Sequence, residues 1–168
     1  MEILSVNAML LAREIHANQR RKFTHSPYAE HLAEVAGIVS TVSSNHPDAR
    51  VTAAVAWLHD SMEDQNVTYL ELLDLFGEAV ANGVQLLSDL EVGNRASRKA
   101  ASRERLSEAP GWVQDIKLAD RISNMPSIIH YDPAFARTYV PESVLLIAVL
   151  TKAHPSLKAM ARGIVEKA

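Results

Sequence analysis

The sequence predicts an all-α fold. Apolar residues recur at intervals of three or four along most of the chain, as at Leu4, Ala8, Leu11 and Ile15. No stretch alternates apolar and polar residues for long enough to predict a strand, and we find no internal repeat, low-complexity segment or linker. A length of 168 residues suits one compact domain, so we expect a single domain over residues 1–168.

The helices are expected in the following order, each from its apolar spacing or its terminal signals. Asp48 after Pro47 is an N-cap candidate for the third helix, and Thr68 with Glu71 forms a capping-box pattern before the fourth. Gly77 is a natural C-terminal stop for that fourth helix. The expected helices lie near residues 4–15, 32–39, 51–62, 69–76, 78–87, 95–107, 110–125, 141–153 and 156–167, with a loop at 88–94.

Composition excludes several classes of function. The chain has no cysteine, which rules out disulfides, thiolate nucleophiles and cysteine-based metal clusters. A formal net charge of −3 argues against bulk binding of nucleic acid. No apolar run approaches the roughly 20 residues of a membrane span, and the first residues lack the features of a secretory signal. We therefore expect a soluble cytoplasmic domain with no nucleic-acid or membrane partner.

The segment HDSMED, residues 59–64, gathers metal-binding side chains near the end of an apolar stretch. Glu63 and Asp64 follow His59 and Asp60 by four residues, which places all four on one side if the helix continues. Three neighbouring carboxylates repel one another unless a positive charge lies among them. Imidazole with carboxylate suits Mn²⁺, Fe²⁺, Zn²⁺ or Mg²⁺. The alternative is a solvated acidic helix end.

A second acidic position lies in IKLADRISN, where Asp120 sits within an apolar stretch. Buried carboxylates are rare unless they are paired or bind a metal. Asn124 follows one turn later, and Lys117 precedes Asp120 by three residues, so a Lys117–Asp120 surface pair is the alternative. His31 taken alone predicts no more than a hydrogen-bonded helix residue.

Taken together, these segments resemble a known family. A histidine, a His-Asp pair and a later aspartate follow the ligand order of HD-domain phosphohydrolases. The segments HANQRRKFTHSPYAEHLAEVAGIV, AAVAWLHDSMEDQNVTYLELLDLFGEAV and IKLADRISNM resemble the hydrolase domain of the RelA/SpoT family, above all its small stand-alone members, over about residues 8–128. The resemblance implies an HD-domain helical bundle that uses Mn²⁺ to remove the 3′-pyrophosphate of guanosine tetra- or pentaphosphate, giving GDP or GTP.

The resemblance also implies roles for individual residues. It implies metal ligands at His31, His59, Asp60 and Asp120, water activation by Glu63 and Asp64, and nucleotide contacts at Arg21, Lys22, Tyr28, Asn124 and Tyr139. This chain departs from the family pattern in three places. Leu32 replaces a frequent proline, FTHS lacks the usual glycine before the PY motif, and segment 88–110 matches poorly.

A polyphosphorylated substrate needs cations, and the sequence offers two basic clusters. The first is residues 20–22, and the second contains Arg95, Arg98, Lys99, Arg103 and Arg105. We expect Arg98 or Lys99 to contact a phosphate, against the alternative that the second cluster is a solvated helix face.

Three other interpretations stay open at this stage. The chain could be another HD-type phosphohydrolase that acts on an adenine alarmone, a nucleoside phosphate or a phosphorylated dinucleotide. It could be a nucleotide sensor without catalysis, although an intact Glu63–Asp64 pair argues against that. It could also be a purely structural all-α domain. The sequence leaves both the metal and a homo-oligomer open.

Overall fold

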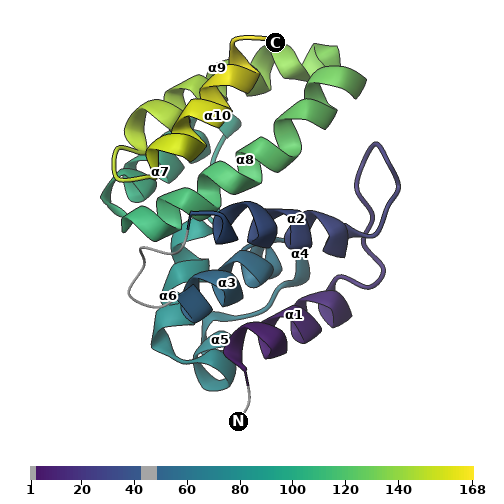
Figure 1. Ribbon diagram of the computed structural model, residues 1–168, viewed down its shortest axis with the longest axis vertical. Helices are drawn as coiled ribbons and strands as arrows, with labels where there is room; N and C mark the ends of the chain where they lie inside the picture. Colours follow the sequence, from purple (N-terminus) through teal and green to yellow (C-terminus); the bar gives the residue numbers. More distant parts are fainter. Residues whose placement is uncertain (1–2, 43–48) are drawn as a thin grey trace. The chain divides into compact units, whose positions relative to one another are not determined.

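The computed structural model describes residues 3–42 and 49–168 (Figure 1). Within these ranges the chain is helical, and its β-type pairing is an isolated bridge between Arg20 and Pro27. The all-α fold class expected from the sequence is confirmed. The helices are α1 (Leu4–Ile15), α2 (Tyr28–Ser40), α3 (Ala49–Leu58), α4 (Ser61–Gln65), α5 (Tyr69–Phe76), α6 (Glu78–Leu87), α7 (Arg95–Glu108), α8 (Gly111–Tyr131), α9 (Pro133–Val149) and α10 (Pro155–Val165).

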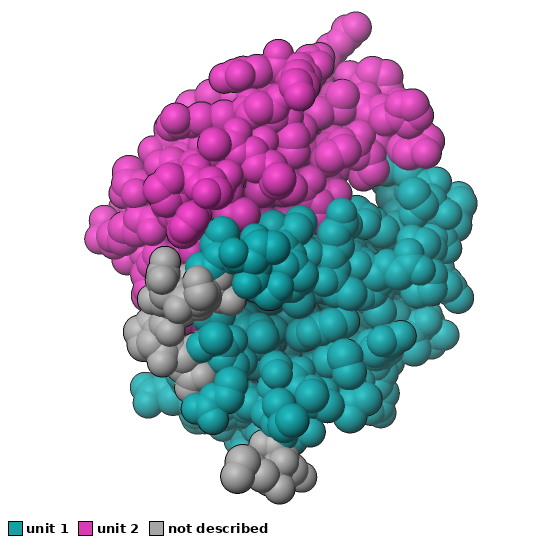
Figure 2. Space-filling view, viewed as in Figure 1, with its two compact units in different colours: residues 1–90 teal, residues 91–168 magenta. Residues whose placement is uncertain are grey.

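The chain forms two compact units, residues 1–90 and residues 91–168 (Figure 2). The first unit contains α1 to α6 and the second contains α7 to α10. The single domain expected over residues 1–168 stays a prediction. No helix in the described part of the chain has both the length and the apolar character needed to cross a bilayer.

The first unit is built around α3, which packs against α1, α2 and α6, while α5 packs against α6. The sequence of α3, ARVTAAVAWL, is apolar on most of its circumference, so neighbours can cover it on several sides. The fully buried side chains of this unit include Leu32 and Val35 of α2, Val55 and Leu58 of α3, and Leu72 of α5.

Local end signals in the first unit act as predicted. The Thr68 hydroxyl accepts from the Glu71 N–H, and the Glu71 carboxylate accepts from the Thr68 N–H, so the capping box is confirmed. Gly77 ends α5 with a φ of 81°, a left-handed conformation that favours glycine. The N-cap predicted at Asp48 lies outside the described residues.

The second unit is built around α8, which packs against α7, α9 and α10. Two buried polar side chains of α8 bind the chain between α9 and α10. Gln114 accepts a hydrogen bond from the Lys152 N–H at 2.8 Å, and Asp115 accepts one from the His154 N–H at 2.6 Å. Polar groups inside α8 therefore anchor the turn that leads to α10.

Two predicted helix limits in this unit are wrong, and prolines explain both. The helix expected at 110–125 continues through the exposed Pro126 to Tyr131, with Ile128 and Ile129 partly buried. The helix expected at 141–153 begins earlier, because Pro133 occupies its first turn and the Asp132 carboxylate accepts from the Phe135 N–H. Pro141 is an internal, exposed residue of α9, so it is not a start signal.

Candidate metal centre

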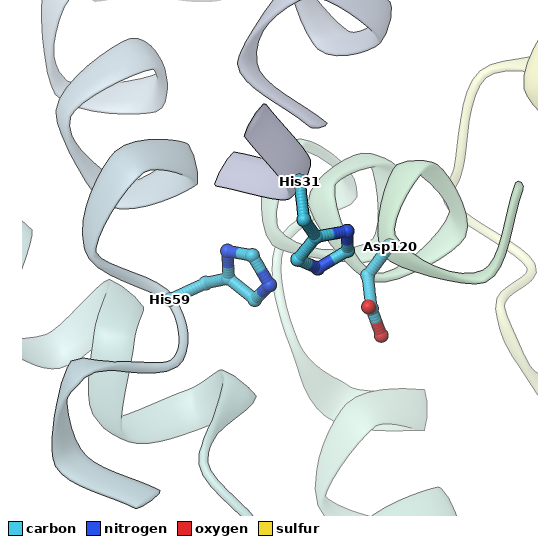
Figure 3. A group of neighbouring side chains, drawn as sticks. All are labelled: His31, His59 and Asp120. Atoms are coloured by element: carbon cyan, nitrogen blue, oxygen red, sulfur yellow. The ribbon is translucent and has the colours of Figure 1, made fainter. Parts of the chain in front are cut away.

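Two buried imidazoles lie side by side in the first unit (Figure 3). His31 comes from the first turn of α2 and His59 follows α3, and their ring centroids are 5.4 Å apart in an edge-to-face arrangement. The His59 Nδ1 lies 2.8 Å from the Ala56 carbonyl oxygen. Because a carbonyl only accepts, Nδ1 carries a proton, and Nε2 is the nitrogen that can bind a metal once it is unprotonated. Histidine ligands of metals commonly show this arrangement, with the second ring nitrogen donating to a carbonyl.

The carboxylate of Asp60 lies next to both rings. Its Oδ2 is 2.9 Å from the His59 Nε2 and 3.6 Å from the His31 Nε2, and it accepts a 2.7 Å hydrogen bond from the Tyr28 hydroxyl. Burial alone would raise the pKa of Asp60, but the positive charge and hydrogen bonds of His59 and His31 outweigh burial and hold that pKa well below its usual range. Asp60 is therefore an anion, and a divalent cation fits this set of two imidazoles and one carboxylate.

The helix predicted over residues 51–62 is interrupted at this point. α3 ends at Leu58, and Asp60 takes φ −98° and ψ 0° before α4 begins at Ser61. The Ser61 hydroxyl donates to the Leu58 carbonyl at 2.6 Å, which satisfies an oxygen at the end of α3. The prediction of one continuous helix is wrong here, although the Asp64 N–H still bonds to the Asp60 carbonyl at 2.9 Å.

The acidic pair Glu63 and Asp64 lies on α4, and both residues are exposed. The Glu63 Oε1 accepts from the backbone N–H of Asp89 at 2.7 Å. The Asp64 Oδ2 accepts from the side-chain amide of Gln19, also at 2.7 Å. Two segments distant in sequence thus hold the two carboxylates, one around Gln19 and one around Asp89. Glu63 and Asp64 also follow Asp60 by only three and four residues along the chain.

Asp120, the third side chain drawn in Figure 3, belongs to α8 in the second unit. It is 8% exposed, and its Oδ1 accepts from the Asn124 amide at 2.6 Å. The Lys117 ammonium is 3.8 Å from its Oδ2. The Lys117–Asp120 proximity considered from the sequence is present, but both side chains are buried, so it is not an ordinary surface pair.

The first basic cluster precedes α2 in a tight turn. Backbone bonds from Arg21 N–H to the Ser26 carbonyl and from Tyr28 N–H to the Gln19 carbonyl close this turn. The Arg21 guanidinium donates to the Glu34 carboxylate at 2.9 Å, and the Lys22 ammonium lies 4.9 Å from the centre of the Phe23 ring. The Arg21–Glu34 pair was not predicted from the sequence.

Two arginines of α7 have acidic partners that sequence reasoning missed. Arg95 donates two 2.8 Å hydrogen bonds to Glu142 of α9, and Arg105 forms an ion pair with Glu91. The hydrogen bond between Arg95 and Glu142 raises the pKa of Arg95 and lowers the pKa of Glu142. Arg98 and Lys99 are partly buried on the same helix, and Lys99 lines a small hollow with Arg103 and Arg121.

Tyr139 is buried within the second unit, on α9. The Arg121 guanidinium lies 4.4 Å from the centre of its ring. Burial raises the pKa of Tyr139 to about 12, although the charge of Arg121 opposes that rise. The structure thus places Tyr139, Asp120 and Asn124 in the second unit, and Arg21, Lys22 and Tyr28 in the first.

Residues 8–153 match the model of the HD domain. The chain is 33% identical over 133 residues to the GTP pyrophosphokinase rsh of Brucella ovis, a match that covers 76% of this chain and 17% of that protein. It is 32% identical over 149 residues to the bifunctional (p)ppGpp synthase/hydrolase SpoT of Escherichia coli K12, covering 85% and 20%. The chain thus spans about a fifth of the length of these curated relatives.

Solved structures give a match along the whole chain. A structure described as that of a metazoan ortholog of SpoT that hydrolyzes ppGpp and plays a role in starvation responses superposes with a TM-score of 0.87. The match covers 99% of this chain and 96% of the other, at 22% sequence identity. A protein from Listeria monocytogenes matches less closely, with a TM-score of 0.68. These likenesses confirm the expected helical fold.

Proposed function

Because the chain belongs to the HD domain family, we propose that it is a metal-dependent hydrolase of guanosine tetra- and pentaphosphate. The reaction adds water at the 3′-pyrophosphate and yields GDP or GTP with pyrophosphate. The observation that carries this proposal is the cluster of His31, His59 and Asp60 immediately before the acidic pair on α4. Similarity to a GTP pyrophosphokinase of Brucella ovis and to the (p)ppGpp synthase/hydrolase SpoT of Escherichia coli supports a guanine alarmone as substrate.

We propose that His31, His59, Asp60 and Asp120 hold the metal and that the metal is Mn²⁺. The burial of His31, His59 and Asp120 supports this, since imidazole nitrogen and carboxylate oxygen are the two ligand types that suit Mn²⁺. When bound, a divalent ion supplies Lewis acidity toward a phosphoryl oxygen and makes a hydroxide nucleophile available near neutral pH.

Glu63 and Asp64 are the proposed catalytic acids and bases. Each carboxylate has one oxygen fixed by a hydrogen bond, Glu63 from the Asp89 N–H and Asp64 from Gln19. A carboxylate fixed in this way has a second oxygen that can orient a water molecule and accept its proton. In this scheme Glu63 and Asp64 act on the water, and the metal ligands do not take its proton.

The proposed substrate contacts are a set of cationic, aromatic and amide side chains. Arg21 stacks on the guanine base with Lys22 beside it, Asn124 and Tyr28 contact the nucleotide, and Arg98 or Lys99 binds a phosphate. Arg21 is already held by Glu34, which fixes the plane of the guanidinium for stacking. The resemblance to the family also suggests Tyr139 as a contact near the guanine base.

The test is incubation of the protein with Mn²⁺ and a panel of guanine and adenine alarmones, with products identified by chromatography. Pyrophosphate with GDP from guanosine tetraphosphate is expected. Orthophosphate from a different nucleotide would favour another HD-type phosphohydrolase, and tight binding without turnover would favour a sensor. Absence of stoichiometric metal, with no stabilisation by Mn²⁺, would favour a purely structural domain.

Variants separate the two proposed kinds of residue. Asp60→Ala is expected to lose both bound Mn²⁺ and turnover, because it removes a ligand. Glu63→Gln is expected to keep Mn²⁺ and lose turnover by at least about a hundredfold, because it removes a base. Glu78→Gln, an exposed glutamate on α6, is the matched control and should retain full activity. Full activity in Glu63→Gln would remove that residue from the mechanism.

A further inference from the structure

Three side chains near the C-terminal ends of α1 and α4 form a hydrogen-bonded cluster next to Asp64. His16 caps the C-terminus of α1, Gln19 follows it by three residues, and Gln65 is the last residue of α4. The Gln19 Oε1 is 2.6 Å from the His16 Nδ1 and 2.7 Å from the Gln65 Nε2. His16 is 1% exposed, so this cluster is anchored in the interior of the first unit.

The hydrogen-bond partners fix the orientation of the Gln19 amide. Its other terminus, Nε2, lies 2.7 Å from the Asp64 Oδ2. A carboxylate only accepts, so the group facing Asp64 must be the amide NH₂, and the oxygen must face His16 and Gln65. The oxygen then accepts from both, which requires a proton on the His16 Nδ1. Rotating the amide would place its oxygen against the Asp64 carboxylate, which has no proton to donate.

His16 also reaches the proposed metal ligand Asp60 by a second route. Its ring stacks on Tyr28 with centroids 5.2 Å apart and planes inclined by 24°. The Tyr28 hydroxyl donates to the Asp60 Oδ2 at 2.7 Å. The end of α1 thus supports two carboxylates, Asp64 through Gln19 and Asp60 through Tyr28.

We propose that Gln19 is a positioning residue that holds Asp64 for water activation, with His16 and Gln65 fixing the amide of Gln19. The proposal rests on the proposed function, in which Asp64 acts on the attacking water. A neutral amide suits this task because it fixes one oxygen without adding a positive charge beside the base. Asp64 is exposed on a five-residue helix, so without the Gln19 bond its side chain would sample several rotamers.

Matched substitutions at neighbouring positions test this role. Gln19→Glu replaces the donor with a second carboxylate facing Asp64, whereas Asn18→Asp makes the same chemical change at the adjacent exposed residue. We expect Gln19→Glu to lower kcat for guanosine tetraphosphate by about tenfold or more, with KM and bound Mn²⁺ unchanged. Asn18→Asp should match the wild type. Equal kcat in the two variants, or a loss confined to KM, would overturn the proposal.

A double-mutant cycle separates positioning from loss of fold. Gln19→Met, which keeps the size of the side chain and removes the donor, should lower kcat in the wild-type background and have no further effect when combined with Asp64→Asn. An equal loss in both backgrounds would show that Gln19 acts elsewhere and would overturn the proposal. Gln65→Met should produce a smaller loss of kcat than Gln19→Met, since it removes one of two donors to the Gln19 oxygen.

A measurement that does not depend on catalysis, the NMR signal of the Gln19 side-chain amide, tests this proposal separately from the proposed function. The side-chain amide resonances of Gln19, assigned by their absence in Gln19→Met, should shift in Asp64→Asn and stay in place in Asp74→Asn, an exposed aspartate of α5. If that shift occurs in a protein that hydrolyses no nucleotide, the hydrogen bond is upheld and the proposed function fails. If the protein is active and the shift is absent, the positioning role fails alone.

Discussion

Asn124 donates a hydrogen bond from its amide to the Oδ1 of Asp120, at 2.6 Å and one turn further along α8. The bond fixes the rotamer of a carboxylate that is 8% exposed. In metal sites, side chains that hydrogen-bond to a ligand hold it in the orientation that binds the metal. Loss of such a partner weakens metal binding. Asn124 thus supports the proposed ligand Asp120, in addition to its proposed contact with the nucleotide.

We therefore predict that Asn124→Ala weakens Mn²⁺ binding by about tenfold, as measured by calorimetric titration without nucleotide. Ser127→Ala, in the next turn of α8, is the control, because the Ser127 hydroxyl donates to the backbone carbonyl of Asn124 and leaves the Asn124 side chain untouched. An unchanged Mn²⁺ affinity in Asn124→Ala would confine Asn124 to nucleotide binding.

His25 has a φ of 58°, the left-handed region that favours glycine. It lies in FTHS, where the family usually has a glycine, so the turn keeps the glycine conformation without the glycine. His25→Gly should raise the free energy of unfolding by about 0.5–1 kcal/mol, and His25→Val should lower it, as measured by chemical denaturation. A destabilised His25→Gly would show that the imidazole contributes more than the backbone conformation costs.

The parts of the fold that were predicted correctly depend on residues close in sequence. The Thr68–Glu71 capping box and the stop at Gly77 each involve a few consecutive residues, so both can be predicted from the sequence without knowing the tertiary structure. The proposed ligands His59 and Asp60 were found for the same reason, because they are adjacent. Helix limits at Pro126 and Pro141 were wrong because tertiary packing carries α8 and α9 past residues that normally end helices.

The missed contacts are those between residues distant in sequence. Gln19 meets Asp64 and Gln65, and Arg95 meets Glu142, but no spacing rule connects positions so far apart. The break between α3 and α4 was missed because it depends on the backbone conformation of Asp60 and on the bond from the Ser61 hydroxyl to the Leu58 carbonyl, which the apolar spacing does not reveal. The His16–Gln19 spacing of three residues was the one available signal for the positioning cluster.

Gly111 lies against the backbone of the turn before α10. A Cβ added at this position would lie 2.6 Å from the Lys152 carbonyl oxygen, which is backbone and cannot rotate away. Gly111→Ala should therefore lower the free energy of unfolding by about 1–3 kcal/mol, measured by thermal or chemical denaturation. Gly163→Ala on α10 is the matched control, since nothing lies within 4 Å of its added Cβ, and it should stabilise the protein by up to about 1 kcal/mol.

The Arg95–Glu142 pair should make stability depend on pH in the acid range. The hydrogen bond from Arg95 lowers the pKa of Glu142, so its contribution is fully present above the unfolded-state pKa of about 4.5. It is lost as the pH falls through the folded-state pKa. Glu142→Gln should cost about 0.5–1 kcal/mol at pH 7, a modest value because solvent partly screens the pair. The difference from the wild type should shrink as the pH falls below about 4.5 and vanish once the pH lies below the folded-state pKa of Glu142, whereas Glu104→Gln should behave like the wild type throughout.

Tyr139 should make stability depend on pH in the alkaline range, with the opposite sign. Burial raises its pKa to about 12 in the folded protein, against about 10 in the unfolded chain. Between these values the unfolded chain releases the phenol proton and the folded protein keeps it, so the wild type loses stability as pH rises above 10.

The loss attributable to Tyr139 approaches about 2–3 kcal/mol near pH 12, and Tyr139→Phe should lack it. Ultraviolet absorbance gives a direct measurement, because the wild-type titration should contain a phenolate step near pH 12 that Tyr139→Phe lacks. Ionisation of Tyr139 near pH 10, with native circular dichroism intact, would show that the Arg121 guanidinium over the ring offsets burial.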